Sequence, residues 1–172
     1  MPTTLTRSEY GLIEHIINLF DGEIVGSMKR KKKPRNKLLQ EECGDLWKEI
    51  IELRDGRRCM VEVLFPEIAV NHDKVYQADH CFTRANKFLF FEVSNGTMVC
   101  SGCNMNKHYD NKSVKRAIDM IVMDREGEER YKEMLACDMK KSANSDWNKV
   151  RWLEEQRDRL LLIRDKLGKE KK

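Results

Sequence analysis

Hydrophobic residues near the start of the chain recur every three or four positions, which is the spacing of one face of an α-helix. Residues 6–9 have the spacing of a capping box, and the apolar positions after them predict a first helix over 7–20. A second stripe predicts a helix that ends at Asp55-Gly56, and its members are Leu39, Cys43, Leu46, Ile50 and Leu53. We therefore expect a helical N-terminal region.

The pattern changes after Gly56, where short runs become rich in β-branched and aromatic residues. The runs 60–65 and 75–79 are predicted to be strands because turn-forming residues bound them. Asn95-Gly96 is a strong turn signal and predicts a hairpin between 88–93 and 97–100. We expect a small antiparallel sheet in this region.

The helical period returns after Cys103. One predicted helix buries the stripe Val114, Ala117, Ile118, Ile121 and Val122, and another follows Gly127 with Tyr131, Met134 and Leu135. Ser145-Asp146 opens a C-terminal helix whose stripe is Val150, Leu153, Leu160 and Leu167. That stripe indicates packing against the core or a partner helix. A homodimer through a short coiled coil stays open, although Arg157 and Arg164 interrupt the seam.

Length and composition predict one α+β domain with helical extensions, since the chain has 172 residues, of which 40% are hydrophobic and 36% charged. No apolar run approaches the roughly 20 residues that a membrane crossing needs. Charged residues also interrupt the first residues, which do not read as a secretory signal. We therefore expect a cytoplasmic protein without a membrane partner.

The net charge of +4 is small, but its distribution is uneven. Seven basic residues stand between Met28 and Lys37 with no acidic residue among them: Lys29, Arg30, Lys31, Lys32, Lys33, Arg35 and Lys37. Such a block attracts a phosphate backbone, or it forms a solvated linker broken at Pro34. Further candidates for phosphate contact are Arg57, Arg58 and Lys107.

Six cysteines in a chain without an export signal favour metal binding over disulfides. Cys100 and Cys103 have the C-x-x-C spacing of a zinc knuckle, and Cys59 supplies a third thiolate. A fourth ligand could come from Glu62, His72 or Cys81, or the cysteines could pack without metal. Cys43 and Cys137 stand in helical patterns and are assigned to packing.

A second group of residues could bind a divalent cation. Asn104 and His108 are four residues apart at the start of a predicted helix, so they share one face. Asp79, at a strand end, could complete a set that suits Mg²⁺ or Mn²⁺ and also admits Zn²⁺ or Ni²⁺. His80 points to the other side of the strand, where a neutral imidazole could act as a general base.

These residues resemble the HNH, or ββα-metal, nuclease motif, in which two antiparallel strands and a helix hold one divalent ion. The resemblance implies that Asp79, Asn104 and His108 are metal ligands and that His80 is the base. Asn95 corresponds to the residue that braces the loop and orients that base, and Asn86 is a less favoured rival. The separations of fifteen and twenty-four residues from His80 to Asn95 and Asn104 fit the motif.

Gln77-Ala78-x-His80, the Phe-x-Glu-Val-x-Asn run ending at Asn95, and Cys100-x-x-Cys103-Asn104 are most similar to phage NinG (Rap) recombination nucleases. Glu62 stands where the usual second knuckle has a cysteine. The resemblance runs from about Arg54 onward and does not cover the first fifty residues. We expect helices with a basic linker at 1–57, a ββα-metal core at 58–125 and a helical extension at 126–172. The resemblance also implies branched DNA as substrate, with no small-molecule substrate, in a phage-infected or lysogenic bacterial host.

Two other classes of function remain open from the sequence. One is a zinc-knuckle protein that binds or assembles on nucleic acid without catalysis. The other is an interaction protein whose C-terminal helix docks a partner.

Overall fold

The computed structural model describes residues 32–68, 72–108, 112–140 and 146–170. The predicted helix at 7–20 and the basic residues Lys29, Arg30 and Lys31 lie outside the described residues. Residues Pro34–Lys172 form one unit by their contacts, and the elements below belong to it.

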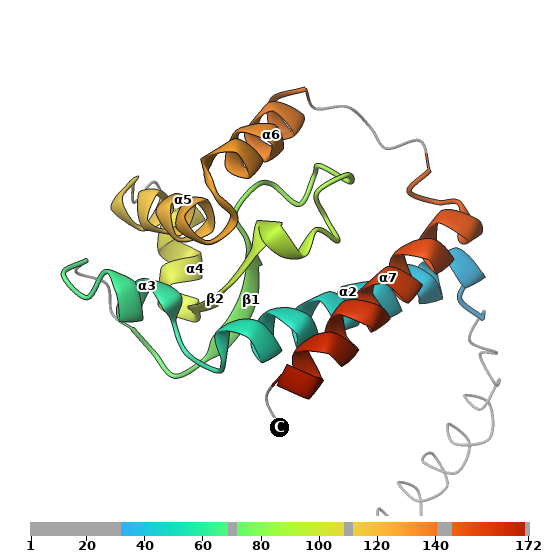
Figure 1. The fold of residues 1–172 in the computed structure, drawn as a ribbon, viewed down its shortest axis with the longest axis horizontal. Coiled ribbons are helices and arrows are strands. Elements are labelled where there is room, and N and C mark those ends of the chain that lie inside the picture. Colours follow the sequence, from blue (N-terminus) through green and yellow to red (C-terminus); the bar gives the residue numbers. More distant parts are fainter. Residues whose placement is uncertain (1–31, 69–71, 109–111, 141–145, 171–172) are drawn as a thin grey trace, which may run out of the picture. The chain divides into compact units, whose positions relative to one another are not determined.

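Two long helices, α2 (Arg35–Asp55) and α7 (Val150–Glu170), pack side by side (Figure 1). The predicted stripe of α7 is confirmed as core: Leu153 and Leu160 are fully buried in one cluster with the apolar face of α2. The predicted end of α2 is confirmed as well, because Gly56 follows it with a φ of 77° that a glycine adopts without strain. The apolar stripe of α7 therefore packs against α2 of the same chain.

A two-stranded antiparallel sheet of β1 (Tyr76–His80) and β2 (Gly96–Cys100) lies between these helices and the rest of the unit (Figure 1). The strand predicted at 75–79 is confirmed within one residue. The hairpin predicted between 88–93 and 97–100 is wrong, because β2 pairs with β1 and its register puts His80 opposite Gly96. The run 88–93 is apolar because Leu89 and Phe91 enter the core from a loop, without strand pairing.

The strand predicted at 60–65 is also wrong, since Met60–Leu64 forms the short helix α3. Val61 is buried against the core while Val63 and Leu64 are about half exposed. A five-residue apolar run does not separate helix from strand by periodicity. Here the segment packs against helix α5 (Lys112–Glu126) and against β2, which pairs with β1 instead.

The remaining helices follow the sequence predictions. They are α4 (Ser101–His108), α5 and α6 (Glu128–Met139), and all the predicted members of the α5 stripe are buried. Gly127, with a φ of 86°, separates α5 from α6. The described residues therefore form an α+β arrangement, and none of their helices is long and apolar enough to cross a membrane.

The packing around Gly96 explains why the Asn95-Gly96 turn signal led to a wrong hairpin prediction. A Cβ atom at Gly96 would lie 2.5 Å from Ile51 Cδ1 and 2.6 Å from Trp47 Cζ2 of α2. The φ of Gly96 is −109°, a backbone conformation that any residue can adopt. Glycine is needed at this position because α2 crosses the strand closely. The signal therefore marks helix–sheet packing at the start of β2.

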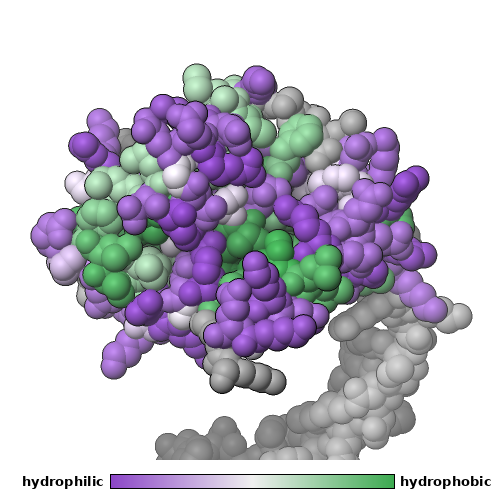
Figure 2. All heavy atoms as spheres, in the orientation of Figure 1, coloured by the Kyte–Doolittle hydropathy of each residue, from purple (hydrophilic) through white to green (hydrophobic). Residues whose placement is uncertain are grey.

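Most of the surface in view is hydrophilic, and hydrophobic side chains gather in small separate patches (Figure 2). This agrees with the 36% of charged residues in the chain.

Candidate active site and metal centre

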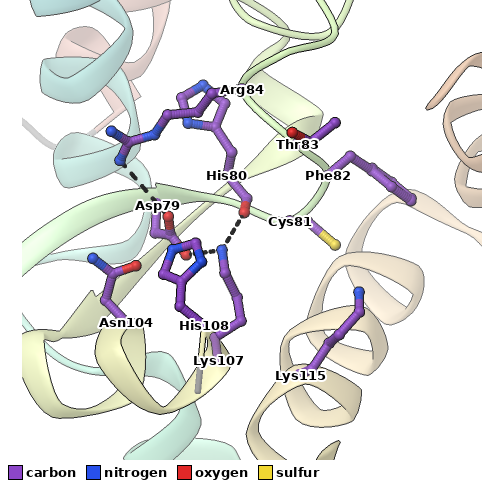
Figure 3. A pocket seen from close by; sticks show the side chains of 10 residues that line it. All are labelled: Asp79, His80, Cys81, Phe82, Thr83, Arg84, Asn104, Lys107, His108 and Lys115. Carbon is purple, nitrogen blue, oxygen red and sulfur yellow. Dashed lines mark hydrogen bonds and ion pairs between the residues drawn. The ribbon is translucent and has the colours of Figure 1, made fainter. Parts of the chain in front are cut away.

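A pocket of about 450 Å³ lies where β1 ends beside helix α4 (Figure 3). Four elements supply its lining: the end of β1, the loop that follows, the face of α4 that the sequence singled out, and the start of α5. The lining residues are Asp79, His80, Cys81, Phe82, Thr83, Arg84, Asn104, Lys107, His108 and Lys115. The four residues predicted to form the divalent site and its base therefore face one pocket.

His80 is held on two sides. Its imidazole stacks on the Trp47 indole, with ring centroids 4.0 Å apart and planes 7° from parallel. Its Nε2 lies 2.9 Å from the Phe90 carbonyl oxygen. A carbonyl only accepts hydrogen bonds, so Nε2 carries the proton and Nδ1 keeps its lone pair. This Nδ1 is buried and has no hydrogen-bond partner among the described residues.

The electrostatic surroundings keep His80 neutral. Burial of the ring lowers the pKa of His80 to about 4, and the cations of Arg84 and Lys107 act in the same direction. The carbonyl of Phe90 and the carboxylate of Asp79 oppose this shift and are outweighed. At neutral pH the imidazole is therefore in the form that can accept a proton.

Asn95 ties together the loop that joins the strands. It is fully buried, its Oδ1 accepts from the Phe82 amide at 2.8 Å, and its Nδ2 donates to the Leu89 carbonyl at 3.0 Å. It thus holds the loop that carries the Phe90 carbonyl, and it acts on His80 through that loop. Asn86 fastens another part of the loop, where its Nδ2 donates to the Cys137 carbonyl at 2.9 Å.

Asp79 is 2% exposed and its carboxylate forms an ion pair with the Lys107 ammonium. Lys107 also donates to the His80 carbonyl oxygen at 2.6 Å, and Arg84 lies 3.8 Å from the other oxygen of Asp79. Figure 3 shows Asp79, Lys107 and His108 close together with Asn104 beside them. A divalent cation would compete with this ammonium for the carboxylate.

The side chain of Asn104 bears on whether these residues fit a cation. Its Oδ1 is buried and has no partner among the described residues. An amide oxygen without a hydrogen bond, near a buried carboxylate and an imidazole, is a donor set that accepts a hard or borderline cation. The Asp79, Asn104 and His108 set therefore fits such an ion once Lys107 withdraws.

A second cluster brings together Cys59, His72, Cys100 and Cys103, whose ligand atoms all lie within 4.8 Å of one another. The Sγ atoms of Cys59 and Cys103 are 3.7 Å apart, and His72 Nδ1 is 3.3 Å and 3.5 Å from the Sγ atoms of Cys100 and Cys103. Tetrahedral zinc, with bonds of roughly 2.3 Å to sulfur and 2.0 Å to nitrogen, separates its ligands by about 3.5–3.8 Å. The cluster could hold a metal such as zinc.

The structure thereby distinguishes the three candidates for the fourth ligand. His72 belongs to the cluster, whereas Glu62 is exposed on α3. The Sγ of Cys81 instead donates to Asp119 Oδ1 at 3.3 Å. The sequence named His72 as a candidate, but only the fold brings it over the knuckle.

The thiols of the cluster already share charge. Hydrogen bonding between the Cys59 and Cys103 thiols lowers the pKa of Cys59 to about 4 and raises the pKa of Cys103. Burial raises the pKa of Cys100. The surroundings of Cys59 thus favour its thiolate, which is the form that binds metal.

The basic residues proposed to contact phosphate are placed at several points of the described chain. Arg35 pairs with Glu154, Arg57 lies 3.1 Å from Glu52, and Arg58 donates to the Asp55 carbonyl. Lys32, Lys33 and Lys37 are exposed. Lys107 lines the pocket, as does Arg84, which no sequence pattern singled out.

No family model, curated protein or solved structure matches this chain.

Proposed function

We propose that the protein is a metal-dependent DNA endonuclease of the HNH type, which hydrolyses phosphodiesters with a water activated by His80. The observation that carries the proposal is the state of this imidazole. Its Nε2 is engaged by the Phe90 carbonyl, and its Nδ1 lone pair is unpartnered among the described residues, beside the pocket of Asp79, Asn104 and His108. A fixed tautomer with a free lone pair is what a general base requires.

In this proposal Nδ1 takes a proton from water as the oxygen attacks phosphorus. Water would reach Nδ1 if Arg84, which lines both neighbouring pockets together with His80, turned toward the substrate phosphate. Arg84 has the freedom to do so, because its side chain is 61% exposed and its contact with Asp79 is 3.8 Å long. Asn95 is a positioning residue in this scheme, since it acts through the loop that carries Phe90.

Asp79, Asn104 and His108 would hold the divalent cation, Mg²⁺ or Mn²⁺ by preference. The ion would neutralise charge on the phosphate and stabilise the leaving oxygen. The order of β1, β2 and α4 along the chain supports a ββα core of this kind. The Cys59, His72, Cys100 and Cys103 cluster would act as a structural zinc site that fixes the start of α4. The preference for branched DNA is part of the proposal and rests on the resemblance to NinG nucleases.

Cleavage of a panel of linear, nicked, flapped and four-way DNAs with Mg²⁺ or Mn²⁺ tests this function. His80→Ala should lower the cleavage rate by about 10²–10⁴-fold, the usual contribution of a general base, while DNA binding persists. Addition of EDTA should abolish product. Cleavage that survives His80→Ala would overturn the mechanism.

A matched pair on α4 tests the cation site. Asn104 lines the pocket, whereas Asn106 donates its Nδ2 to the Gly102 carbonyl within the helix. Asn104→Ala should raise the concentration of Mn²⁺ needed for half-maximal cleavage, and Asn106→Ala should leave it unchanged. An equal response of the two variants would remove Asn104 from the site.

A second candidate function is nucleic-acid binding stabilised by zinc without catalysis. The Lys107–Asp79 ion pair favours it, because the ammonium neutralises the carboxylate that a catalytic cation needs. This candidate predicts salt-sensitive DNA binding with no metal-dependent product on any member of the DNA panel.

A further inference from the structure

Gly44 stands in the middle of helix α2, where glycine is less stable than alanine. A Cβ atom at this position would meet no atom within 4 Å. Gly44 has ordinary helical backbone, so neither its conformation nor its packing requires glycine. Gly96 differs, because α2 itself fills the space beside it. The fold thus leaves Gly44 unexplained.

The open space at Gly44 belongs to a second pocket, of about 390 Å³. Trp47, Phe90 and Ala78 give this pocket apolar walls, and Gln40 and Asp45 give it polar edges. It also contains His80 and Arg84, which line the first pocket as well. The second pocket therefore adjoins the proposed catalytic site at His80 and Arg84.

We propose that this second pocket binds the nucleobase of the nucleotide next to the phosphate that is cleaved at His80. The inference rests on the proposed function, which it deepens by naming a subsite for the substrate. A base is a flat ring that the volume accommodates easily. Phe90 and Ala78 suit its faces, since Trp47 is 2% exposed and stacks on His80. The Gln40 amide oxygen and the Asp45 carboxylate suit its amino and ring N–H groups.

Charge assigns the base, and not the phosphate, to this pocket. Glu41 and Asp45 both line it from α2, and Lys48 pairs with Asp45 at 2.9 Å. The two carboxylates are balanced by the cations of Lys48 and Arg84, which line the same pocket, so its lining has no net positive charge to attract a second phosphate. Arg84 stands at the boundary that the two pockets share, where a phosphate between them would meet a cation. A strand lying across His80 would thus place its phosphate by Arg84 and its base beside Gly44.

The direct test fills the pocket from the helix. Gly44→Leu projects a side chain toward the pocket from a Cβ position that meets no atom within 4 Å, and Gly44→Ala gives a smaller graded change. Gly168→Leu is the matched control, because Gly168 lies in α7, also has nothing within 4 Å, and lies outside both pockets. Thermal unfolding should place both leucine variants at or above the wild-type midpoint, since each replaces a helical glycine.

Binding is measured with the four deoxynucleoside monophosphates and with deoxyribose 5-phosphate, which lacks a base. The wild type should bind at least one nucleotide at least about tenfold more tightly than the sugar phosphate, in line with the stacking of one base. Gly44→Leu should remove that difference and Gly168→Leu should keep it. Equal affinities in the wild type, or a difference that survives Gly44→Leu, would overturn the proposal.

A cleavage experiment with the wild type and Gly44→Leu completes the test. On a DNA with one mapped cut, an abasic site beside the cut should slow the wild type by at least about tenfold, and should slow Gly44→Leu little further. If nucleotides bind as expected and no DNA is ever cut, the base pocket stands and the nuclease proposal fails. If DNA is cut and the abasic site has no effect, the nuclease proposal stands and the base pocket fails.

Discussion

The cluster of Cys59, His72, Cys100 and Cys103 and the pocket of Asp79, Asn104 and His108 share helix α4, yet they are prepared for a cation to different degrees. In the cluster the ligand atoms stand at the separations of a tetrahedral site. In the pocket the carboxylate is occupied by Lys107. The cluster is thus organised in advance, whereas the pocket must exchange an ammonium for its ion.

Loss of a cluster ligand should have the largest effect. Cys103→Ser should lose the bound metal and several kcal/mol of stability, because zinc binding to such a site contributes about 10 kcal/mol or more to folding. Metal analysis of the purified protein and denaturant unfolding would measure both. Cys137→Ser is the control, since Cys137 is half-buried outside the cluster. A wild type without a stoichiometric metal would break the comparison.

Removal of the ammonium from the pocket should have the next largest effect. Lys107→Met should lower the unfolding free energy by about 3–5 kcal/mol without divalent ions, because Asp79 is left as a buried charge. Added Mn²⁺ should restore more stability to this variant than to the wild type, which unfolding at increasing Mn²⁺ would reveal. Equal Mn²⁺ stabilisation of both proteins would show that Lys107 does not compete with the ion.

Asp55 is a reference carboxylate that serves the fold alone, and its removal should have the smallest effect. Burial would raise its pKa, but hydrogen bonds from Arg54 and from the Met98 amide lower it overall. Its contribution is therefore complete above its unfolded pKa, near 3.8, and is lost as the pH falls below that value.

Asp55→Asn should accordingly cost about 1–3 kcal/mol at pH 7, the range of hydrogen bonds to a charged group, and progressively less below pH 3.8. Urea unfolding as a function of pH would measure the change. Mn²⁺ binding should equal that of the wild type. A constant cost at every pH would mean that packing, and not charge, is what Asp55 supplies.

The sequence was most informative about the long elements. Stripes such as Leu153 and Leu160 predicted α7, and β1 was predicted within one residue. It failed for 60–65 and 88–93, where apolar residues enter the core from a short helix and a loop. In both segments the backbone conformation depends on tertiary neighbours. The segments are also too short to show whether their apolar residues repeat every two or every 3.6 positions.

The sequence predicted which residues belong to the candidate site, but it did not predict which residues they contact. Asp79, His80, Asn104 and His108 were named from spacing, and they line one pocket because a strand end and one helical face present them. The pairing of Lys107 with Asp79 joins residues 28 positions apart, and His72 reaches a knuckle at a similar distance along the chain. Such contacts depend on how the loops return, which local pattern does not encode.

Cys103 and Asn104 are consecutive residues of one helical turn. A chelator that extracts zinc from the first would therefore also loosen the support of the second. If the protein is the proposed nuclease, inhibition by a chelator would arise from loss of either ion, and added magnesium alone would restore activity only to protein that has kept zinc in the cluster. Restoring zinc and magnesium in different orders would then show which metal's loss removed the activity.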